Sequence, residues 1–381
     1  MRYHGRDGHR GADDPHPQPR GVPRARPAVL HAHRDGRGVP AHVPSPDRDR
    51  WIALGEVHAL RAAVTPLHVA VASHYLLPVT GYGGTERVVV ALVRGLAALG
   101  HRVTLLAAPG TRVPEARVLE VPPARLTDPA ADLDALLPRD ADILHLHFPV
   151  RRTLRRPFVQ TLHGNLGAGG TVPPHNIFVS RDHARRHGSD VFVYNGLDPG
   201  DYVFRTEKDD YDLFLGRLHS VKGYRWAVAA AKRTGRRLVV AGGRRPSFRR
   251  NIRYVGRVDG REKAELLAAA RCLWMPALWD EPFGLTTIEA LLSGTPVLGT
   301  RRGALPEVLT PAVGALCDTL DEMVVAADTI HTRDPSACRA HAERYFTHLV
   351  MAEEYTRLYR RLLETGRLPP GRPAPHLATA G

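Results

Sequence analysis

The sequence predicts an α/β protein with two Rossmann-like domains and a cleft between them, preceded by an extension that cannot form a core. Its 381 residues are the length of two ordinary domains. Short apolar runs alternate with amphipathic stretches in two successive blocks, a pattern typical of parallel sheets covered by helices. Residues 1–65 are instead rich in Pro, Arg, His, Gly and Asp and show no sustained period.

These patterns divide the chain into segments. We expect a disordered extension over residues 1–65, a first Rossmann-like domain over 66–203, and a second over 204–340. Apolar residues recur at helical spacing over 341–365, and we expect this helix to pack back across the first domain. Residues 366–381 are predicted to form a disordered tail.

The chain is strongly basic, with a formal net charge of +14 and a pI near 10.2. Such a surface attracts anions, whether nucleotide phosphates or an anionic membrane. We find no zinc-finger, helix-turn-helix or RNA-binding aromatic motif and expect no nucleic-acid partner. The three cysteines lack metal-like spacing, and no secretory signal or apolar run of about 18 residues is evident. We therefore expect a cytoplasmic protein, with peripheral association at the inner membrane face as a further option.

The first domain opens with an apolar run over 67–73, which predicts a buried strand. The loop Gly81-Tyr-Gly-Gly84 leads from it into an amphipathic helix that ends at Gly100. Further strands are predicted over 102–107, 142–147, 158–162 and 176–180. Because the carboxyl ends of parallel strands form the ligand edge of such a sheet, the glycine loop is expected at a binding site.

The second domain repeats this pattern after a turn-rich linker over 194–202. Strands are predicted over 211–216, 237–241, 253–255 and 272–275, with helices near 222–233 and 261–270. Arg217 and Lys222 follow the first of these strands, so both are expected at the ligand edge, where they can converge on phosphates. A cation in a loop is usually a solvated charge, but this shared position favours a binding role.

The most informative stretch is Glu281-Pro-Phe-Gly-Leu-Thr-Thr-Ile-Glu289, in which seven residues separate two acids. Pro282 and Gly284 interrupt the preceding strand, and the helical spacing that follows predicts a helix N-terminus there. Free backbone N–H groups and the helix dipole make such an N-terminus a phosphate site. Carboxylates repel phosphate but accept hydrogen bonds from sugar hydroxyls. The pair therefore indicates a nucleotide sugar, the alternative being two solvated acids on a surface helix.

Five motifs occur in a fixed order: Gly81-Tyr-Gly-Gly84, Thr161-Leu-His-Gly164, Tyr194-Asn-Gly-Leu-Asp198, Gly216-Arg217 with Lys222-Gly223, and Glu281 to Glu289. In this order they resemble the GT-B glycosyltransferases of family 4, and the resemblance covers most of 67–365. It implies a retaining glycosyltransferase, in particular a hexosyltransferase, that uses a nucleotide diphosphate sugar without a bound metal and without a cofactor.

The resemblance also implies that the first domain holds the acceptor and the second holds the nucleotide sugar, and it assigns roles to residues of the second domain. Arg217 and Lys222 would hold the diphosphate and stabilise charge on it as it departs. Glu289 would accept hydrogen bonds from the ribose, and Glu281 from the transferred sugar. The diphosphate site would be completed by the backbone amides of three consecutive residues, Phe283, Gly284 and Leu285. Residues 253–258 lie where the family reads the nucleobase.

In the first domain the resemblance assigns three residues. Gly83 and Gly84 would let the backbone approach the diphosphate or the sugar. His163 would face the reacting sugar, so that Arg217, Lys222, Glu281 and His163 are the predicted catalytic residues. His145 and His147 share one face of a strand, and this pattern fits packing in the core or a loop as well as it fits acceptor binding.

The donor is expected to be UDP- or GDP-linked, and the acceptor stays open among a glycan, a lipid-linked molecule and a small molecule. The acceptor is open because two loops at its expected entry depart from the family. The loop over 148–157 is short and carries four arginines, and the piece over 166–170 is brief.

Three alternatives compete with a glycosyltransferase. An epimerase of nucleotide sugars on the same fold would need further acids, and the segment from Glu281 to Glu289 argues against it. A catalytically silent protein that binds nucleotide sugars or glycans is disfavoured because both cations and both acids are present. A dehydrogenase would need an acid after the second strand, where Ala108-Pro109-Gly110 stands instead.

Overall fold

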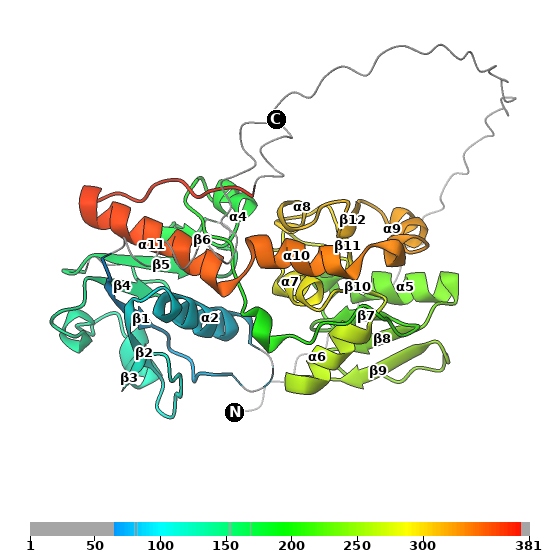
Figure 1. The fold of residues 1–381 in the computed structure, drawn as a ribbon, viewed down its shortest axis with the longest axis horizontal. Helices are drawn as coiled ribbons and strands as arrows, with labels where there is room; N and C mark the ends of the chain where they lie inside the picture. Colours follow the sequence, from blue (N-terminus) through cyan, green and yellow to red (C-terminus); the bar gives the residue numbers. More distant parts are fainter. Residues whose placement is uncertain (1–64, 80, 82, 152–153, 168, 375–381) are drawn as a thin grey trace, which may run out of the picture. The chain divides into compact units, whose positions relative to one another are not determined.

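The computed structural model describes residues 65–79, 81, 83–151, 154–167 and 169–374. These residues form two six-stranded sheets in which neighbouring strands are parallel. Helices flank each sheet (Figure 1), and the predicted fold of two Rossmann-like domains is confirmed. Residues 1–64 of the predicted extension lie outside the described residues.

The first sheet has the strand order β3-β2-β1-β4-β5-β6. Its strands are β1 (His68–Ala72), β2 (Arg102–Ala107), β3 (Arg117–Glu120), β4 (Ile143–Leu146), β5 (Phe158–Leu162) and β6 (Asn176–Phe178). Its helices are α2 (Gly84–Ala98), α3 (Pro123–Thr127) and α4 (Arg181–Arg186). Alternate residues of β1 enter different cores, Val69 and Val71 on one face and Ala70 and Ala72 on the other. Both faces are buried, which explains why every residue of the strand after His68 is apolar.

The second sheet has the order β12-β11-β10-β7-β8-β9. Its strands are β7 (Asp212–Leu215), β8 (Leu238–Ala241), β9 (Ile252–Gly256), β10 (Cys272–Met275), β11 (Val297–Thr300) and β12 (Gly314–Cys317). Its helices are α5 (Tyr224–Thr234), α6 (Gly260–Ala269), α7 (Leu285–Leu292), α8 (Leu305–Val308) and α9 (Leu320–Ala326). The strand order changes direction between β7 and β10. Ligands of such sheets bind at this switch point, beyond the carboxyl ends of the strands.

Three strands lie outside the elements that the sequence predicted, namely β3, β11 and β12. Each has only four residues. Runs this short carry no reliable period, and parallel pairing of β3 with β2 and of β11 with β10 and β12 makes them strands.

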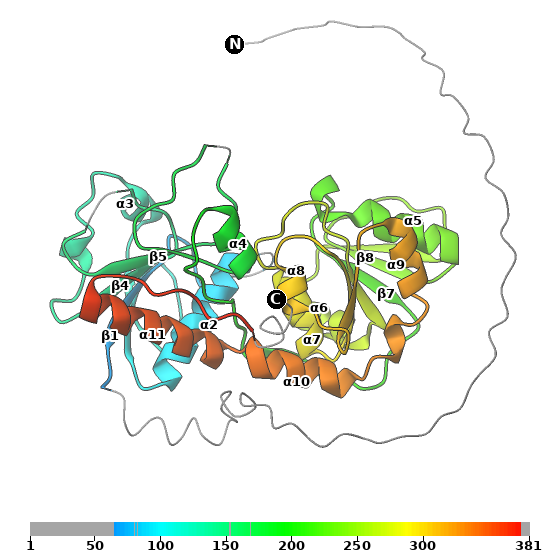
Figure 2. The ribbon, with the colours of Figure 1, turned by 90° about the horizontal axis from the view of Figure 1, so that it is seen from above.

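The chain returns to the first domain through two helices, α10 (Pro335–Tyr345) and α11 (His348–Thr365). The prediction of one continuous helix over 341–365 is therefore wrong, because the structure has two helices there. α10 packs on α7, whereas α11 packs on α2 and runs beside it in both views (Figures 1 and 2).

A backbone contact with the linker causes the break between these helices. Leu197 donates its N–H to the carbonyl of Phe346 at 3.0 Å and accepts the N–H of His348 at 2.9 Å. The Thr347 hydroxyl then accepts the N–H of Val350 at 3.2 Å, which caps the N-terminus of α11.

The predicted disorder of residues 366–381 is wrong for residues 366–374. Gly371 donates its N–H to the carbonyl of Asp190 at 2.9 Å, and Ala374 is buried. The side chain of Arg357 donates to the carbonyl of Pro370 at 3.0 Å. These contacts are with distant residues, so the local composition did not reveal them. Residues 375–381 lie outside the described residues.

Among the described helices, none is both long and apolar enough to cross a membrane.

The contact of α2 with α11 gives a first test. A Cβ atom added to Gly95 would lie 2.4 Å from the carbonyl oxygen of His348 and 2.8 Å from the Cβ of Ala352. Gly95→Ala should therefore lower the free energy of unfolding by about 1–3 kcal/mol, although alanine favours a helix over glycine by about 1 kcal/mol. Urea unfolding measures this change. An unchanged or raised stability would show that helix propensity outweighs the close approach.

Candidate functional site

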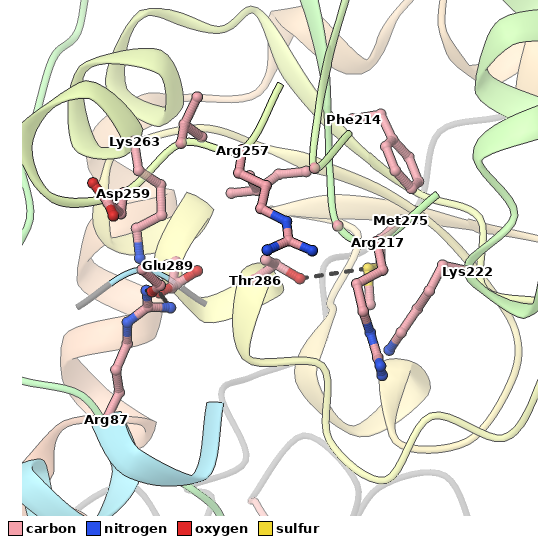
Figure 3. A pocket seen from close by; sticks show the side chains of 15 residues that line it. Arg87, Phe214, Arg217, Lys222, Arg257, Asp259, Lys263, Met275, Thr286 and Glu289 are labelled. Carbon is pink, nitrogen blue, oxygen red and sulfur yellow. Dashed lines mark hydrogen bonds and ion pairs between the residues drawn. The ribbon is translucent and has the colours of Figure 1, made fainter. Parts of the chain in front are cut away.

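A cavity of about 500 Å³ opens at the switch point of the second sheet (Figure 3). Residues at the carboxyl ends of β7, β8 and β10 line it, together with residues from α6, α7 and the first domain. The lining residues are Gly81, Arg87, Phe214, Leu215, Gly216, Arg217, Lys222, Gly242, Arg257, Val258, Asp259, Lys263, Met275, Thr286 and Glu289. Two distant regions that the sequence singled out, Arg217 to Lys222 and the helix that carries Glu289, thus meet here.

The cavity carries an excess of positive charge. Five cations line it, namely Arg87, Arg217, Lys222, Arg257 and Lys263, against two carboxylates. A concave, partly enclosed surface of this kind concentrates the field of its charges, so it attracts a polyanion.

The position of Lys222 is set by the backbone. A 3₁₀ turn over Ser220–Lys222 follows β7, and Gly223 after it has φ of 70°. A Cβ atom on Gly223 would lie 1.6 Å from the carbonyl oxygen of Pro276, so only glycine fits. Arg217 and Lys222 both point into the cavity beside Met275 (Figure 3).

Glu281 reaches the cavity through Lys222. The ammonium of Lys222 lies 2.5 Å from Oε2 of Glu281, and the indole N–H of Trp279 donates to the same oxygen at 2.8 Å. Lys222 also lies 4.8 Å from the centre of the Trp279 ring. Glu281 is buried and does not itself line the cavity. Its predicted role with the transferred sugar stays a prediction.

The N-terminus of α7 forms where the sequence predicted it. Gly284 adopts φ of 84° and starts the helix at Leu285. The Phe283 side chain is buried against Tyr194 and Phe346, so only its backbone can serve a ligand. Backbone N–H groups in the first turn lack helical partners and carry the positive end of the dipole.

Glu289 lies in the second turn of α7 and is the most connected acid of the cavity. It is 2% exposed. Its Oε1 accepts from Lys263 at 2.6 Å and from the hydroxyl of Tyr202 at 3.0 Å, and lies 3.6 Å from the guanidinium of Arg87. Burial and the Glu289 charge raise the pKa of Tyr202 well above its usual value, so this hydroxyl keeps its proton and donates.

The glycine loop approaches α7. A Cβ atom on Gly84 would lie 3.3 Å from Cδ1 of Leu285. Gly83 precedes α2 in extended backbone, and the atoms nearest to a Cβ there would be those of the flexible Glu86 carboxylate. Gly81 lines the cavity itself. The loop and the N-terminus of α7 are therefore close, while the roles of Gly83 and Gly84 toward a donor stay predictions.

His163 lies in a cluster of histidines at the carboxyl ends of β4 and β5. Its Nε2 is 2.9 Å from Nδ1 of His147, whose ring stacks on that of His145. His145 in turn hydrogen-bonds the hydroxyls of Tyr359 at 2.6 Å and Thr161 at 2.8 Å. His163 does not line the cavity, so its role at the sugar stays a prediction, and His145 belongs to the core.

Sequence reasoning missed three residues that the structure brings to the site, namely Arg87, Tyr202 and Lys263. For two of them, the sequence contains a feature that could have identified them. Arg87 is a cation in the first turn of a helix, where the dipole disfavours it. Lys263 sits on the apolar face of α6, with Ala264 and Leu267 buried beside it. A charge in either place indicates a specific partner.

No described group of three or more His, Cys, Asp or Glu side chains is arranged to hold a metal ion. The absence of a metal and of a cofactor from the reaction stays a prediction.

Two family models match the chain in tandem. The one described as Glycosyltransferase Family 4 matches residues 82–195, in the first domain. The one described as Glycosyl transferases group 1 matches residues 211–332, in the second. The chain belongs to the group 1, family 4 glycosyltransferases, which share the GT-B fold.

Curated relatives match to different extents. The chain is 27% identical to the phosphatidyl-myo-inositol mannosyltransferase of Mycobacterium tuberculosis over 359 residues, which cover 74% of this chain and 94% of the relative. It is 31% identical to the glycogen synthase of the same organism over 176 residues, 40% of this chain and 42% of the relative. A 41.2 kDa protein of the cps region of Klebsiella pneumoniae is 27% identical over 170 residues, 39% and 45% of the two chains. The last two matches span less than half of each relative.

Among solved structures, the chain is similar to AviGT4, a glycosyltransferase involved in Avilamycin A biosynthesis. The TM-score is 0.66 at 28% identity, over 78% of this chain and 98% of that one. The sucrose-phosphate synthase of Thermosynechococcus elongatus shares the fold with a TM-score of 0.59 at 20% identity, over 78% and 99% of the chains.

The histidine cluster predicts a pH dependence of stability. Burial lowers the pKa of His145 to about 3 and that of His163 to about 4. An unfolded histidine takes up a proton near pH 6.5, so the folded state is favoured above that pH. Between pH 6.5 and about 4, stability should fall as pH falls, by at most about 1.4 kcal/mol per pH unit for each such histidine.

Urea unfolding at several pH values checks this expectation. His163→Gln should reduce the slope of the free energy of unfolding against pH by the contribution of about one proton, about 1.4 kcal/mol per pH unit. This holds whatever the substitution does to absolute stability. His331→Gln, at an exposed position, is the matched control and should leave the slope unchanged. Equal slopes for His163→Gln and the wild type would mean that His163 titrates normally in the folded state.

Proposed function

We propose that this protein is a retaining glycosyltransferase that moves a hexosyl group from a nucleotide diphosphate donor to a hydroxyl of an acceptor. The observation that carries the proposal is the convergence of Arg217, Lys222, the N-terminus of α7 and Glu289 on one cavity. Family membership supports transfer chemistry, and the charge of the cavity supports a donor with phosphates.

The chemistry of the lining groups fits the parts of such a donor. A diphosphate suits the two cations and the free amides of α7, because each makes charge-assisted hydrogen bonds to phosphate oxygens. A ribose suits Glu289, whose Oε1 is engaged by Lys263 and Tyr202. Its second oxygen can then accept from vicinal hydroxyls.

Transfer breaks the bond between the anomeric carbon of the sugar and the diphosphate oxygen, and the electron pair leaves with the diphosphate. Negative charge therefore grows on the leaving oxygens in the transition state, next to Arg217, Lys222 and the α7 amides. Groups already placed around developing charge lower the barrier without reorganising. Retention requires the acceptor hydroxyl to bond on the face from which the diphosphate leaves, and its proton passes to a departing phosphate oxygen.

The names of the relatives indicate only the general class of the donor and of the acceptor. The curated relatives include mannosyltransferases named for phosphatidylinositol compounds, one of them dependent on GDP-mannose, and a glycogen synthase. We therefore propose a UDP- or GDP-linked donor and a glycan, lipid-linked or small-molecule acceptor. Association with an anionic membrane stays an extension of this proposal and suits the net charge of +14.

A panel of UDP-, GDP- and dTDP-sugars tests the proposal in two stages. A ligand that binds the folded state raises the melting temperature, so a thermal shift selects the donor. Release of free nucleotide from that donor, with and without acceptor candidates, then measures turnover. Binding without any turnover would favour a silent binding protein, and conversion of the sugar without nucleotide release would favour an epimerase. Failure of the whole panel to shift the melting temperature would reject the proposal.

Arg217→Ala and Lys222→Ala should each lower kcat by about 10²–10³, because both remove stabilisation of the leaving diphosphate. The loss should persist at saturating donor. Arg225→Ala is the matched control, since this arginine is exposed on α5 and does not line the cavity. A rise in KM with unchanged kcat would show that the two cations bind ground state and transition state equally.

Glu289→Gln should weaken donor binding by about 10- to 100-fold, because a charged acceptor of ribose hydroxyls is lost. Glu262→Gln, exposed on α6, serves as control. Isothermal titration of the nucleotide diphosphate measures the change. The ribose role would be refuted by a folded Glu289→Gln variant with the affinity of the wild type.

A further inference from the structure

One guanidinium connects the glycine loop of the first domain with the acid of the second. Arg87 lies in the first turn of α2, and its side chain donates to the carbonyl of Gly81 at 2.7 Å. Another of its nitrogens lies 3.6 Å from Oε1 of Glu289. Figure 3 shows Arg87 rising from α2 toward Glu289, while Lys263 reaches the same acid from the other side. Arg87 therefore touches the two regions between which a donor would lie.

The contacts of Glu289 differ in length, and this difference is informative. Lys263 and Tyr202 are within hydrogen-bonding distance of Oε1, at 2.6 and 3.0 Å. They fix the carboxylate from α6 and from the linker between the domains. Arg87 is an ion-pair neighbour at 3.6 Å, beyond the distance of a short hydrogen bond. It is the contact that can tighten without moving the acid.

The position of Arg87 in its helix has a cost that a partner must offset. The positive end of the α2 dipole disfavours a cation in the first turn. Glu86 in the same turn and Glu289 across the cavity supply negative charge. The Arg87 side chain is about a quarter exposed and that of Glu289 is 3% exposed, so water screens this pair only in part.

We propose that Arg87 is a positioning residue that couples occupation of the nucleotide site to the placement of the glycine loop. This inference rests on the proposed function. A nucleotide in the cavity displaces water from around Arg87 and Glu289, and the lower local polarity strengthens their attraction. The tightened Arg87 holds the Gly81 carbonyl. Gly83 and Gly84 are thereby fixed against the N-terminus of α7, where Gly84 already approaches Leu285.

The proposed role needs an arginine because the side chain must contact two groups at once. Its planar fork presents separate N–H groups to the Gly81 carbonyl and to the Glu289 carboxylate, whereas a lysine presents one nitrogen. Arg87→Lys thus keeps the charge of the cavity and removes the link. Arg94 supplies a matched control on the same helix, seven residues further on. It pairs with Asp201 at 2.9 Å and Asp198 at 3.6 Å and does not line the cavity around Glu289.

Hydrogen exchange with UDP and GDP as probes tests the coupling. Amides in the first turn of α2 have no helical acceptors and exchange rapidly unless the loop is held. Saturation with the nucleotide that binds should slow their exchange at least about tenfold in the wild type. Arg87→Lys should bind that nucleotide within about threefold of the wild type and show no slowing. Arg94→Lys should behave as the wild type in both measurements.

Catalysis gives a second readout on the same variants. With the donor sugar found by thermal shift, Arg87→Lys should lower kcat about tenfold with KM nearly unchanged. Glu289→Gln probes the link from its other end and should also abolish the slowing of exchange at saturating nucleotide. This second variant keeps the test decisive if Arg87→Lys folds poorly.

Each other outcome rejects the coupling. If Arg87→Lys binds nucleotide weakly but shows wild-type slowing at saturation, Arg87 is only a ligand-binding cation. If the wild type binds nucleotide without slowing of exchange, there is no coupling to explain. If neither UDP nor GDP binds the wild type, the proposed function fails, and this inference fails with it.

Discussion

The buried carboxylate of Glu289 is the interaction on which the rest of the site depends. Three separate parts of the chain reach it: Lys263 from α6, Tyr202 from the linker and Arg87 from the first domain. A buried carboxylate is strongly destabilising unless it is paired and hydrogen-bonded. The need to satisfy one acid therefore fixes how α2, the linker and the second sheet meet around the cavity.

Other contacts between the two domains are made by Glu307 of α8 and by Pro282. The Glu307 carboxylate accepts the backbone N–H of Arg181 at 2.9 Å and the hydroxyl of Tyr194 at 2.8 Å. Burial raises the pKa of Glu307, and these donors oppose the rise. The Ser180 hydroxyl donates to the carbonyl of Pro282, immediately before the N-terminus of α7. The helix whose Thr286 and Glu289 line the cavity is thus held by first-domain groups as well.

The fold and part of the site could be predicted from sequence because they depend on local pattern. The strand over 67–73 was found within one residue of β1 at each end because both its faces are buried, which makes every position after His68 apolar. Gly284 and the spacing after it located the N-terminus of α7. Arg217 and Lys222 were found because the carboxyl edge of a parallel sheet is where ligands bind. The resemblance to family 4 added roles to residues that local pattern had already selected.

Tertiary structure alone decided which side chains meet. Arg87 and Glu289 are 202 positions apart in the chain, and no local period links a first-domain helix to an acid on α7. The break at Phe346 and Thr347 arises from backbone bonds to Leu197, and the order of residues 366–374 arises from contacts near Asp190 and Phe192. His163 likewise proved to be bonded to His147 rather than open to the cavity. Sequence determines the periods and turns that build each element, whereas contacts between distant elements exist only once the chain has folded.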